Sequence, residues 1–338
     1  MPLSIVKTMK TEPGVEPQWQ AAAEAIHRAQ SVLVVAHFAP DGDAVGSLLG
    51  LAQPLRALGK EVTVAIDDGV PAELRFIPGS ESVLPALSKG KFDLMVAVDC
   101  SDLERSGKSG DFGLKNSKLS INLDHHPTNT FYGDLHLVVP RAVAAVEIVY
   151  DFLGYLGGEV TADVAFALLT GLVTDTQGFR ISATNSRTLE IAQDLMNRGA
   201  PLAQIMAKTL NSRPFAEVEL WNQVLPSVRL EQGLIFATIR QSDIHCVGLK
   251  KMADGGLVSH LVNVNEAKVS IVFKELPKRQ VEIAFRAKPG YDVASLAFQL
   301  GGGGHTLASG CTTSGTIEQV QDKVIPMAYQ VIAEETGA

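Results

Sequence analysis

Hydrophobic and polar positions alternate in blocks along the first half of the chain. Four short runs rich in β-branched residues contain almost no polar interruption: 31–37, 61–67, 93–99 and 119–124. Such runs are typical of strands that are buried on both faces of a parallel sheet. Helical patterns lie beside them, at 18–30, 44–58, 141–156, 162–173 and 187–197. This alternation predicts an α/β domain with a doubly wound parallel sheet.

The pattern changes after Gly199. Pro201 and Pro214 interrupt the stretch 199–214, which is typical of a connecting helix and linker. Beyond it the pattern predicts strands at 227–240, 268–274 and 280–286, and helices at 292–300 and 317–335. A chain of 338 residues exceeds the size at which one core usually keeps growing. We therefore expect a first domain at 1–198, a linker at 199–214 and a smaller, mainly antiparallel α+β domain at 215–338, with a cleft between the domains.

Composition and charge narrow the class of protein. Hydrophobic residues make up 46% and charged residues 20% of the chain, as in ordinary globular proteins. The formal net charge of −8 disfavours binding of long nucleic acid, which needs many basic contacts to phosphates. Three cysteines without CxxC spacing argue against a disulfide framework and a thiolate zinc site. Because the N-terminus lacks a signal-peptide core and every apolar stretch is short, we expect a cytoplasmic protein with no membrane partner.

Acids and histidines follow three of the four predicted strands. In chain order they are His37, Asp41 and Asp43 after the first strand, Asp99 after the third, and Asp124, His125 and His126 after the fourth. Asp175 ends the apolar helical pattern that begins at 162. Since ligands of open parallel sheets bind outside the carboxyl ends of the strands, we expect these side chains to meet at one edge.

Four carboxylates at one edge would repel one another unless cations were present. The four are Asp41, Asp43, Asp99 and Asp175. Two divalent cations would offset their charge, and a set of oxygen and nitrogen ligands suits manganese or magnesium. The histidines favour manganese, whereas the absence of cysteine from the set disfavours zinc.

Each of these residues also has a simpler interpretation. Asp43 is placed to cap a helix that begins at Ala44, and Asp99 could end its strand with backbone hydrogen bonds. A tandem histidine pair such as His125 and His126 is common on surfaces, and Asp175 could be a polar helix end. All four interpretations would have to hold at the same sheet edge, so the combination favours a metal site.

The ordered motifs resemble the DHH phosphoesterase superfamily. The motifs are "HFAPDGDAVGS" from 37, "VAVDCSDLER" from 96, "DHH" from 124 and "TDTQGFR" from 174. The stretch "FRAKPGYDVASLAFQLGGGGHTLASG" from 285 looks like the DHH-associated domain, with its glycine run ending in histidine. Chain size and this glycine run are most similar to the bacterial nanoRNase and pAp phosphatase group, in which Gly is common at the position of Gln177.

The resemblance implies a ligand set. It assigns one metal to His37, Asp41 and Asp99, and the other to Asp43, Asp99, His125 and Asp175, with Asp99 bridging. It also makes Asp99, Asp124 and His126 catalytic candidates: Asp124 orients a neighbouring group, and His126 stabilises the phosphoryl group or protonates the leaving oxygen. The implied cofactors are two Mn²⁺, with Mg²⁺ as the alternative, and the implied chemistry is attack by a metal-activated water.

A second set of residues is expected to bind the substrate. It comprises Arg286, Gly302, Gly303, Gly304 and His305. Consecutive glycines can turn their N–H groups toward an anion, with His305 at the start of a short helix, and the guanidinium of Arg286 suits a terminal phosphate. The simpler interpretation of the glycine run is a linker or a helix C-cap. Arg180 is a further candidate for the phosphate.

The resemblance implies a manganese-dependent phosphoesterase that degrades very short RNA to mononucleotides and converts pAp to AMP. The alternatives are a phosphodiesterase for cyclic or linear signalling dinucleotides, a single-strand DNA exonuclease, a type II inorganic pyrophosphatase, and a nucleotide-binding sensor without catalysis. Expected partners are short oligoribonucleotides, pAp or dinucleotides, and a homodimer is left open.

Overall fold

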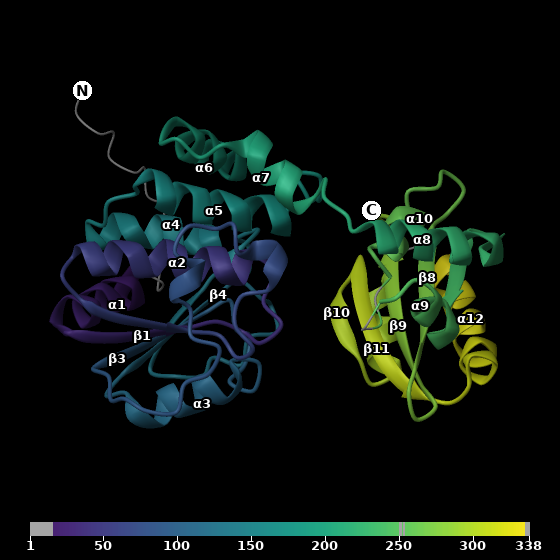
Figure 1. The fold of residues 1–338 in the computed structure, drawn as a ribbon, viewed down its shortest axis with the longest axis horizontal. Coiled ribbons are helices and arrows are strands. Elements are labelled where there is room, and N and C mark those ends of the chain that lie inside the picture. Colours follow the sequence, from purple (N-terminus) through teal and green to yellow (C-terminus); the bar gives the residue numbers. More distant parts are fainter. Residues whose placement is uncertain (1–15, 250–251, 253, 335–338) are drawn as a thin grey trace. The chain divides into compact units, whose positions relative to one another are not determined.

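The computed structural model describes residues 16–249, 252 and 254–334, and the chain divides into two compact units between Ser212 and Arg213 (Figure 1). Helix α7 (Leu202–Thr209) lies within the stretch expected to be a linker, and its Ile205 is buried in the core of the first unit. In the described part of the chain, no helix combines the length and the apolar character needed to cross a membrane.

A five-stranded parallel sheet forms the centre of the first unit, with strand order β2-β1-β3-β4-β5. Its strands are β1 (Ser31–Val35), β2 (Glu61–Ala65), β3 (Leu94–Val98), β4 (Ser120–Asp124) and β5 (Leu135–Val138). The predicted parallel sheet and its first four strands are confirmed. Strand β5 was not predicted, because four residues beside a glycine turn carry too little periodicity to be distinguished from a loop.

Helices cover both faces of this sheet, as the doubly wound prediction requires (Figure 1). On one face lie α1 (Glu16–Arg28), α2 (Gly42–Ala57) and α4 (Ala145–Leu156), and on the other lies α3 (Gly107–Asn116). Helix α5 (Ala162–Asp175) packs on α2 and α4, and α6 (Ser186–Asn197) packs on α5; short 3-10 turns lie at Ala72–Leu74 and Ser80–Ser82. Alternation along β1 explains the two layers: Val32 and Val34 face the layer of α2, α4 and α5, whereas Leu33 and Val35 face α3. The sequence analysis did not predict α3.

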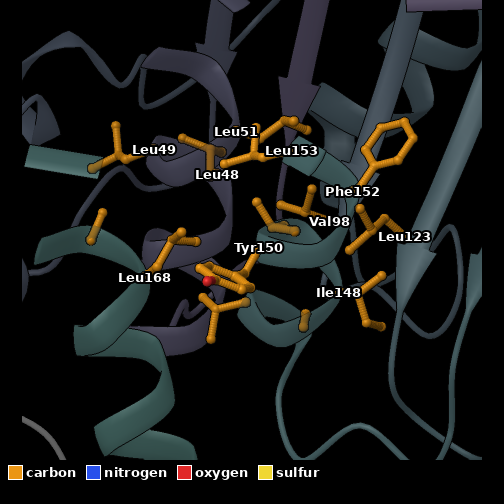
Figure 2. Close-up of a cluster of buried hydrophobic side chains, with 14 of the residues drawn as sticks. Leu48, Leu49, Leu51, Val98, Leu123, Ile148, Tyr150, Phe152, Leu153 and Leu168 are labelled. Atoms are coloured by element: carbon orange, nitrogen blue, oxygen red, sulfur yellow. The ribbon is translucent and has the colours of Figure 1, made fainter. Parts of the chain in front are cut away.

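The larger core lies between the sheet and the layer of α2, α4 and α5 (Figure 2). Leu48 and Leu51 of α2 point into it together with Val98, Phe152 and Leu168, and all are fully buried. Two glycines let α2 and α5 approach closely. A Cβ at Gly46 would lie 2.5 Å from the carbonyl oxygen of Ala167, and a Cβ at Gly171 would lie 3.1 Å from Cα of Asp43. This contact brings the start of α2 beside the end of α5.

The second unit is a six-stranded sheet with strand order β10-β11-β9-β8-β7-β6. Its strands are β6 (Arg229–Glu231), β7 (Leu234–Ile239), β8 (Val269–Leu276), β9 (Gln280–Ala287), β10 (Gly303–His305) and β11 (Ala308–Ser314). Only β7 and β8 are parallel, so the prediction of a mainly antiparallel sheet is confirmed. Its helices are α8 (Phe215–Val224), α9 (Gln241–Cys246), α10 (Leu257–Leu261), α11 (Val293–Gln299) and α12 (Ile317–Ala333), with a 3-10 turn at Leu225–Ser227.

Two predictions for this unit are wrong in detail. The single strand expected at 227–240 is the hairpin of β6 and β7, which turns at Gln232 and Gly233, both with positive φ. The helix expected from His305 is absent, because 303–305 form the edge strand β10, which pairs with β11. A glycine run carries no apolar alternation, so the pattern of residues could not identify this strand.

Candidate metal centre

The structure brings every predicted metal ligand to the carboxyl edge of the first unit's sheet. His37 follows β1, Asp99 follows β3, and His125 follows β4 directly. Asp41 and Asp43 lie at the start of α2, and Asp175 is the last residue of α5. The close approach of α2 and α5 therefore completes the ring of side chains that the strand ends begin.

Among the described residues, the ligand atoms form three overlapping groups: His37, Asp41 and Asp99; Asp99, His125 and His126; and Asp43, His125 and Asp175. Because His125 contacts Asp43, Asp99 and Asp175, we treat these four residues as one group, so that two groups share Asp99. In the first, Nε2 of His37 lies 3.4 Å from Oδ2 of Asp99 and 3.9 Å from Oδ1 of Asp41. In the second, Nε2 of His125 lies 3.6 Å from Oδ1 of Asp99, 3.8 Å from Oδ2 of Asp43 and 3.7 Å from Oδ2 of Asp175. Each carboxylate oxygen of Asp99 thus faces a different group.

Asp99 is held in an unusual backbone conformation. Its φ is +54°, in the left-handed region that few residues other than glycine and asparagine adopt without strain. Its side chain is only 2% exposed, and within the described residues its Oδ1 has no hydrogen-bond partner. A buried carboxylate oxygen without a donor is costly, and a cation removes that cost.

The two histidines present lone pairs to the carboxylates. Nδ1 of His37 lies 2.8 Å from the carbonyl oxygen of Phe38, and Nδ1 of His125 lies 3.3 Å from that of Ala142. A carbonyl only accepts, so in each ring Nδ1 carries the proton and donates it, which leaves Nε2 as an acceptor. Acceptors that face carboxylate oxygens across less than 4 Å fit a bound cation and match the usual arrangement of metal-bound histidine.

The two acids of α2 have different structural roles. Asp41 caps the helix, because its Oδ1 accepts from the N–H groups of Asp43 and Ala44 at 3.0 Å each. The alternative that Asp43 caps this helix is therefore wrong. Asp43 instead accepts from the N–H groups of Ala145 at 2.6 Å and Val146 at 2.9 Å. The pattern predicted that this helix begins at 141. The contact with Asp43 explains why α4 begins at Ala145 instead.

Asp124 orients His126. Oδ1 of Asp124 accepts from Nδ1 of His126 at 2.8 Å, and its Oδ2 accepts from Nδ2 of Asn129 at 2.7 Å. Nδ1 of His126 also lies 3.7 Å from Oδ1 of Asp99, so the ring borders the second group. The sequence analysis missed Asn129, which is buried and also donates to Oδ1 of Asn122. The one feature of the sequence that could have identified Asn129 is its position three residues after the histidine pair.

The ionisation of the site reflects crowding of buried carboxylates. Burial, together with the charges of Asp99 and Asp175, raises the pKa of Asp43 well above its usual range. Burial raises the pKa of Asp175 to about 7, although the charge of His125 opposes this. Burial also opposes ionisation of Asp99, but the contact with the imidazole of His37 and the nearby imidazoles of His125 and His126 hold its pKa below the usual value. Without cations, the site keeps part of its carboxylates protonated.

The donor set fits a pair of hard divalent cations. It consists of carboxylate oxygens and imidazole nitrogens, and the groups of ligand atoms found among the described residues include no cysteine. Oxygen-rich sites with some imidazole suit manganese and magnesium, whereas structural zinc sites favour thiolates.

These pKa shifts predict how the metal-free protein responds to pH. The pKa values of Asp43, Asp175, His37 and His126 are all raised in the folded state. A raised pKa stabilises the fold below the unfolded pKa, and this stabilisation is lost as pH rises through the folded pKa. Chelated protein should therefore be less stable at about pH 8 than at about pH 5.5, by roughly 2–4 kcal/mol.

Thermal unfolding with chelator and with Mn²⁺ at both pH values measures this difference. Added Mn²⁺ should restore stability mainly at the higher pH, because ligands must be deprotonated to bind. Equal stability of the chelated protein at both pH values would contradict the predicted crowding.

The predicted substrate residues lie in the second unit. Arg286 of β9 pairs with Ala308 of β11, which pairs with His305 of β10, so the three share one face of the sheet. A Cβ at Gly302 would lie 2.2 Å from the carbonyl oxygen of Gly310, and Gly304 has a φ of +135°, so both positions need glycine. A Cβ at Gly303 would meet nothing within 4 Å.

Arg180 belongs to the first unit. Its Nε donates to the carbonyl oxygen of Gln177 at 2.7 Å. Gln177 has a φ of +51°, which gives a physical reason why glycine is common at this position in the group that the motifs resemble.

Comparison with known proteins agrees with this geometry. The family model "DHH family, N-terminal domain" matches residues 31–172, and the "DHHA1 domain" matches residues 234–334. The bifunctional oligoribonuclease and PAP phosphatase NrnA of Thermus thermophilus is 33% identical over 319 residues, which cover 93% of this chain and 94% of that protein.

Two solved structures show the same fold. An exopolyphosphatase-related protein from Bacteroides fragilis superposes with a TM-score of 0.85 at 23% identity, covering 93% of this chain and 96% of that one. RecJ from Thermus thermophilus, solved in complex with Mn²⁺, has a TM-score of 0.53 at 16% identity, covering 98% of this chain and 56% of that one. With its DHH domain followed by a DHHA1 domain, the chain belongs to the DHH family.

Proposed function

We propose that this protein is a phosphoesterase that hydrolyses very short oligoribonucleotides to mononucleotides and pAp to AMP, with two divalent cations, preferably Mn²⁺, as cofactors. The observation that carries the proposal is the pair of ligand groups that share the two oxygens of Asp99. The substrate class rests on the likeness to the oligoribonuclease and PAP phosphatase of Thermus thermophilus, which extends over 93% of this chain.

In this proposal, residues of the first unit bind the cations and act on the phosphoryl group. His37, Asp41 and Asp99 would hold one cation, and the other would be held by Asp43, Asp99, His125 and Asp175. When bound, the cations supply a water of lowered pKa and neutralise charge on the phosphoryl oxygens. His126 stabilises the phosphoryl group or gives a proton to the leaving oxygen. Asp124 supports this role, because it fixes the ring through Nδ1 and its charge helps to raise the pKa of His126 against the effect of burial.

The second unit supplies substrate contacts in this proposal. The guanidinium of Arg286 is largely buried, and within the described residues its Nε has no hydrogen-bond partner. An unfilled donor on a planar guanidinium suits a phosphate oxygen. Gly303, Gly304 and His305 form the strand at the edge of the same sheet, and Gly302 precedes it directly, so all four are proposed as further contacts. We also propose a cytoplasmic location, supported by three free cysteines.

A substrate panel tests the function. Purified protein is assayed with a diribonucleotide, pAp, a cyclic dinucleotide and pyrophosphate, in Mn²⁺, in Mg²⁺ and after chelation. We expect the highest kcat/KM for the diribonucleotide and pAp in Mn²⁺, and no turnover after chelation. Arg286→Ala should raise KM by about tenfold or more. A higher kcat/KM for the cyclic dinucleotide would contradict the proposed substrates and indicate a signalling-dinucleotide phosphodiesterase. Stoichiometric binding without turnover would identify a sensor.

A further inference from the structure

A groove in the second unit extends well beyond Arg286. It has a volume of about 490 Å³ and lies along β9 and β11, with residues of β8 and the start of α10 at its sides. Helices α11 and α12 cover the opposite face of this sheet, where Ile283 and Phe285 are buried. The groove face therefore carries the alternate residues of β9, which are Glu282, Ala284 and Arg286.

Strand pairing arranges this face in three rows. The first row holds Ser270, Arg286, Ala308 and His305. The second row holds Val272, Ala284, Gly310 and Gly303. The third row holds Lys274, Glu282 and Thr312. Arg286 lies four positions after Glu282 along β9, so the first and third rows lie roughly 13 Å apart.

The middle row forms a flat floor. Val272 is buried in the core that α10 covers, and the other side chains of this row are at most a methyl group. A Cβ at Gly303 would meet nothing within 4 Å, so the space there is open. Charged side chains stand at both ends of the floor. A flat floor of this length between two basic side chains suits the sugars or bases of more than one nucleotide, with phosphates at its two ends.

The two basic side chains, Arg286 and Lys274, differ in their hydrogen-bond partners. Arg286 has an Nε without a partner among the described residues. Lys274 is only 8% exposed, and its Nζ donates to Oε1 of Glu282 at 2.5 Å. The Glu282 side chain is 41% exposed, so it can turn to water when another anion takes its place. The far end of the groove thus holds a cation whose partner is exchangeable.

We propose that Lys274 binds a second phosphate of the substrate, beyond the nucleotide held at Arg286, and that Glu282 competes with this phosphate. This inference rests on the proposed function. A phosphate at the third row belongs only to substrates that span the floor, so pAp, a single nucleotide, does not use it. Lys274 and Glu282 therefore set how the enzyme ranks oligonucleotides against pAp.

The charges explain why the pair would select for length. A phosphate that reaches Lys274 meets the carboxylate of Glu282 at close range, and like charges repel. Longer substrates gain the ammonium contact only by displacing this carboxylate, so the gain is partial in the natural protein. Removal of the Glu282 charge should therefore favour longer substrates, and removal of the Lys274 charge should disfavour them.

Steady-state kinetics with pAp, a diribonucleotide and a pentaribonucleotide tests this inference. Lys274→Met keeps the length of the buried stem, and we expect it to raise KM for the pentaribonucleotide about tenfold, with kcat and all pAp kinetics changed less than about twofold. Lys274→Arg should restore the long substrate, and Glu282→Gln should lower its KM about threefold. Lys278→Ala, an exposed lysine in the β8–β9 turn, is the matched control.

A further variant covers the case in which Lys274→Met fails to fold. Thr312→Glu adds a negative charge to the third row from an exposed position, and it should raise KM for the pentaribonucleotide alone. Equal effects of these variants on pAp and on RNA, or no effect on either, would overturn the inference while the wild-type activities still support the proposed function. A wild-type protein that is inactive on both substrates would instead refute the proposed function.

Discussion

Asp99→Asn is expected to reduce hydrolysis of diribonucleotide and pAp by at least about a thousandfold, because it removes a ligand charge shared by both metal groups. The same change should not destabilise the metal-free fold. Asparagine tolerates the left-handed backbone at φ +54°. Its amide can donate to Nε2 of His37, so the variant keeps a polar contact with that ring.

Three measurements on this variant separate a ligand effect from a folding effect. Activity is measured with excess Mn²⁺, metal binding by calorimetry, and stability by thermal unfolding in chelator. We expect loss of at least one bound Mn²⁺ and an unfolding temperature equal to or above that of the chelated wild type. Asp111→Asn, on the exposed pair between Asp111 and Lys115 of α3, is the control and should keep full activity. Activity within tenfold of wild type would contradict the shared role of Asp99.

The position of the acids was predictable because two simple rules act together. Buried parallel strands appear as uninterrupted apolar runs, and their carboxyl ends must lie at one edge. His37, Asp99 and His125 follow such runs within two residues, so their convergence needed no knowledge of the loops. Asp175 was predictable for a related reason, since it ends an apolar helix whose length the pattern indicates.

The contacts between distant segments were not predictable from these rules. Asp43 receives the N–H groups of Ala145 and Val146, about a hundred residues further along the chain. No local pattern indicates this contact. The sequence therefore offered Asp43 as a cap of the helix that follows it directly, and it predicted a start for α4 that is too early. The close approach at Gly46 and Gly171 was equally unpredictable, because a glycine in a helix does not indicate which segment packs against it.

The glycine run illustrates a different limit. Glycines 302–304 were expected to form an anion-binding loop, and the last two of them pair in an edge strand instead. Side-chain periodicity is the signal for strands, and a run without side chains has none. The pairing with β11 brings His305 into the same row as Arg286, so the strand itself explains why these two residues share a face.

Asp43→Ala is expected to lose activity and stability together, in contrast to Asp175→Ala. Both variants remove a ligand of the second group, so both should reduce turnover by at least about a hundredfold. Asp43 also accepts two backbone N–H groups at the start of α4, and it is only 1% exposed. Its removal leaves both donors buried without an acceptor, at a cost of about 1–3 kcal/mol each.

Thermal unfolding in chelator at about pH 5.5 separates the two roles, because the carboxylate charges then repel one another least. Asp43→Ala should lower the unfolding temperature of the first unit by roughly 5–15 °C. Asp175→Ala should leave it within about 2 °C, because no hydrogen bond to its carboxylate occurs among the described residues and its pKa is already raised. Equal destabilisation by both variants would show that Asp43 stabilises α4 no more than any other acid of the site.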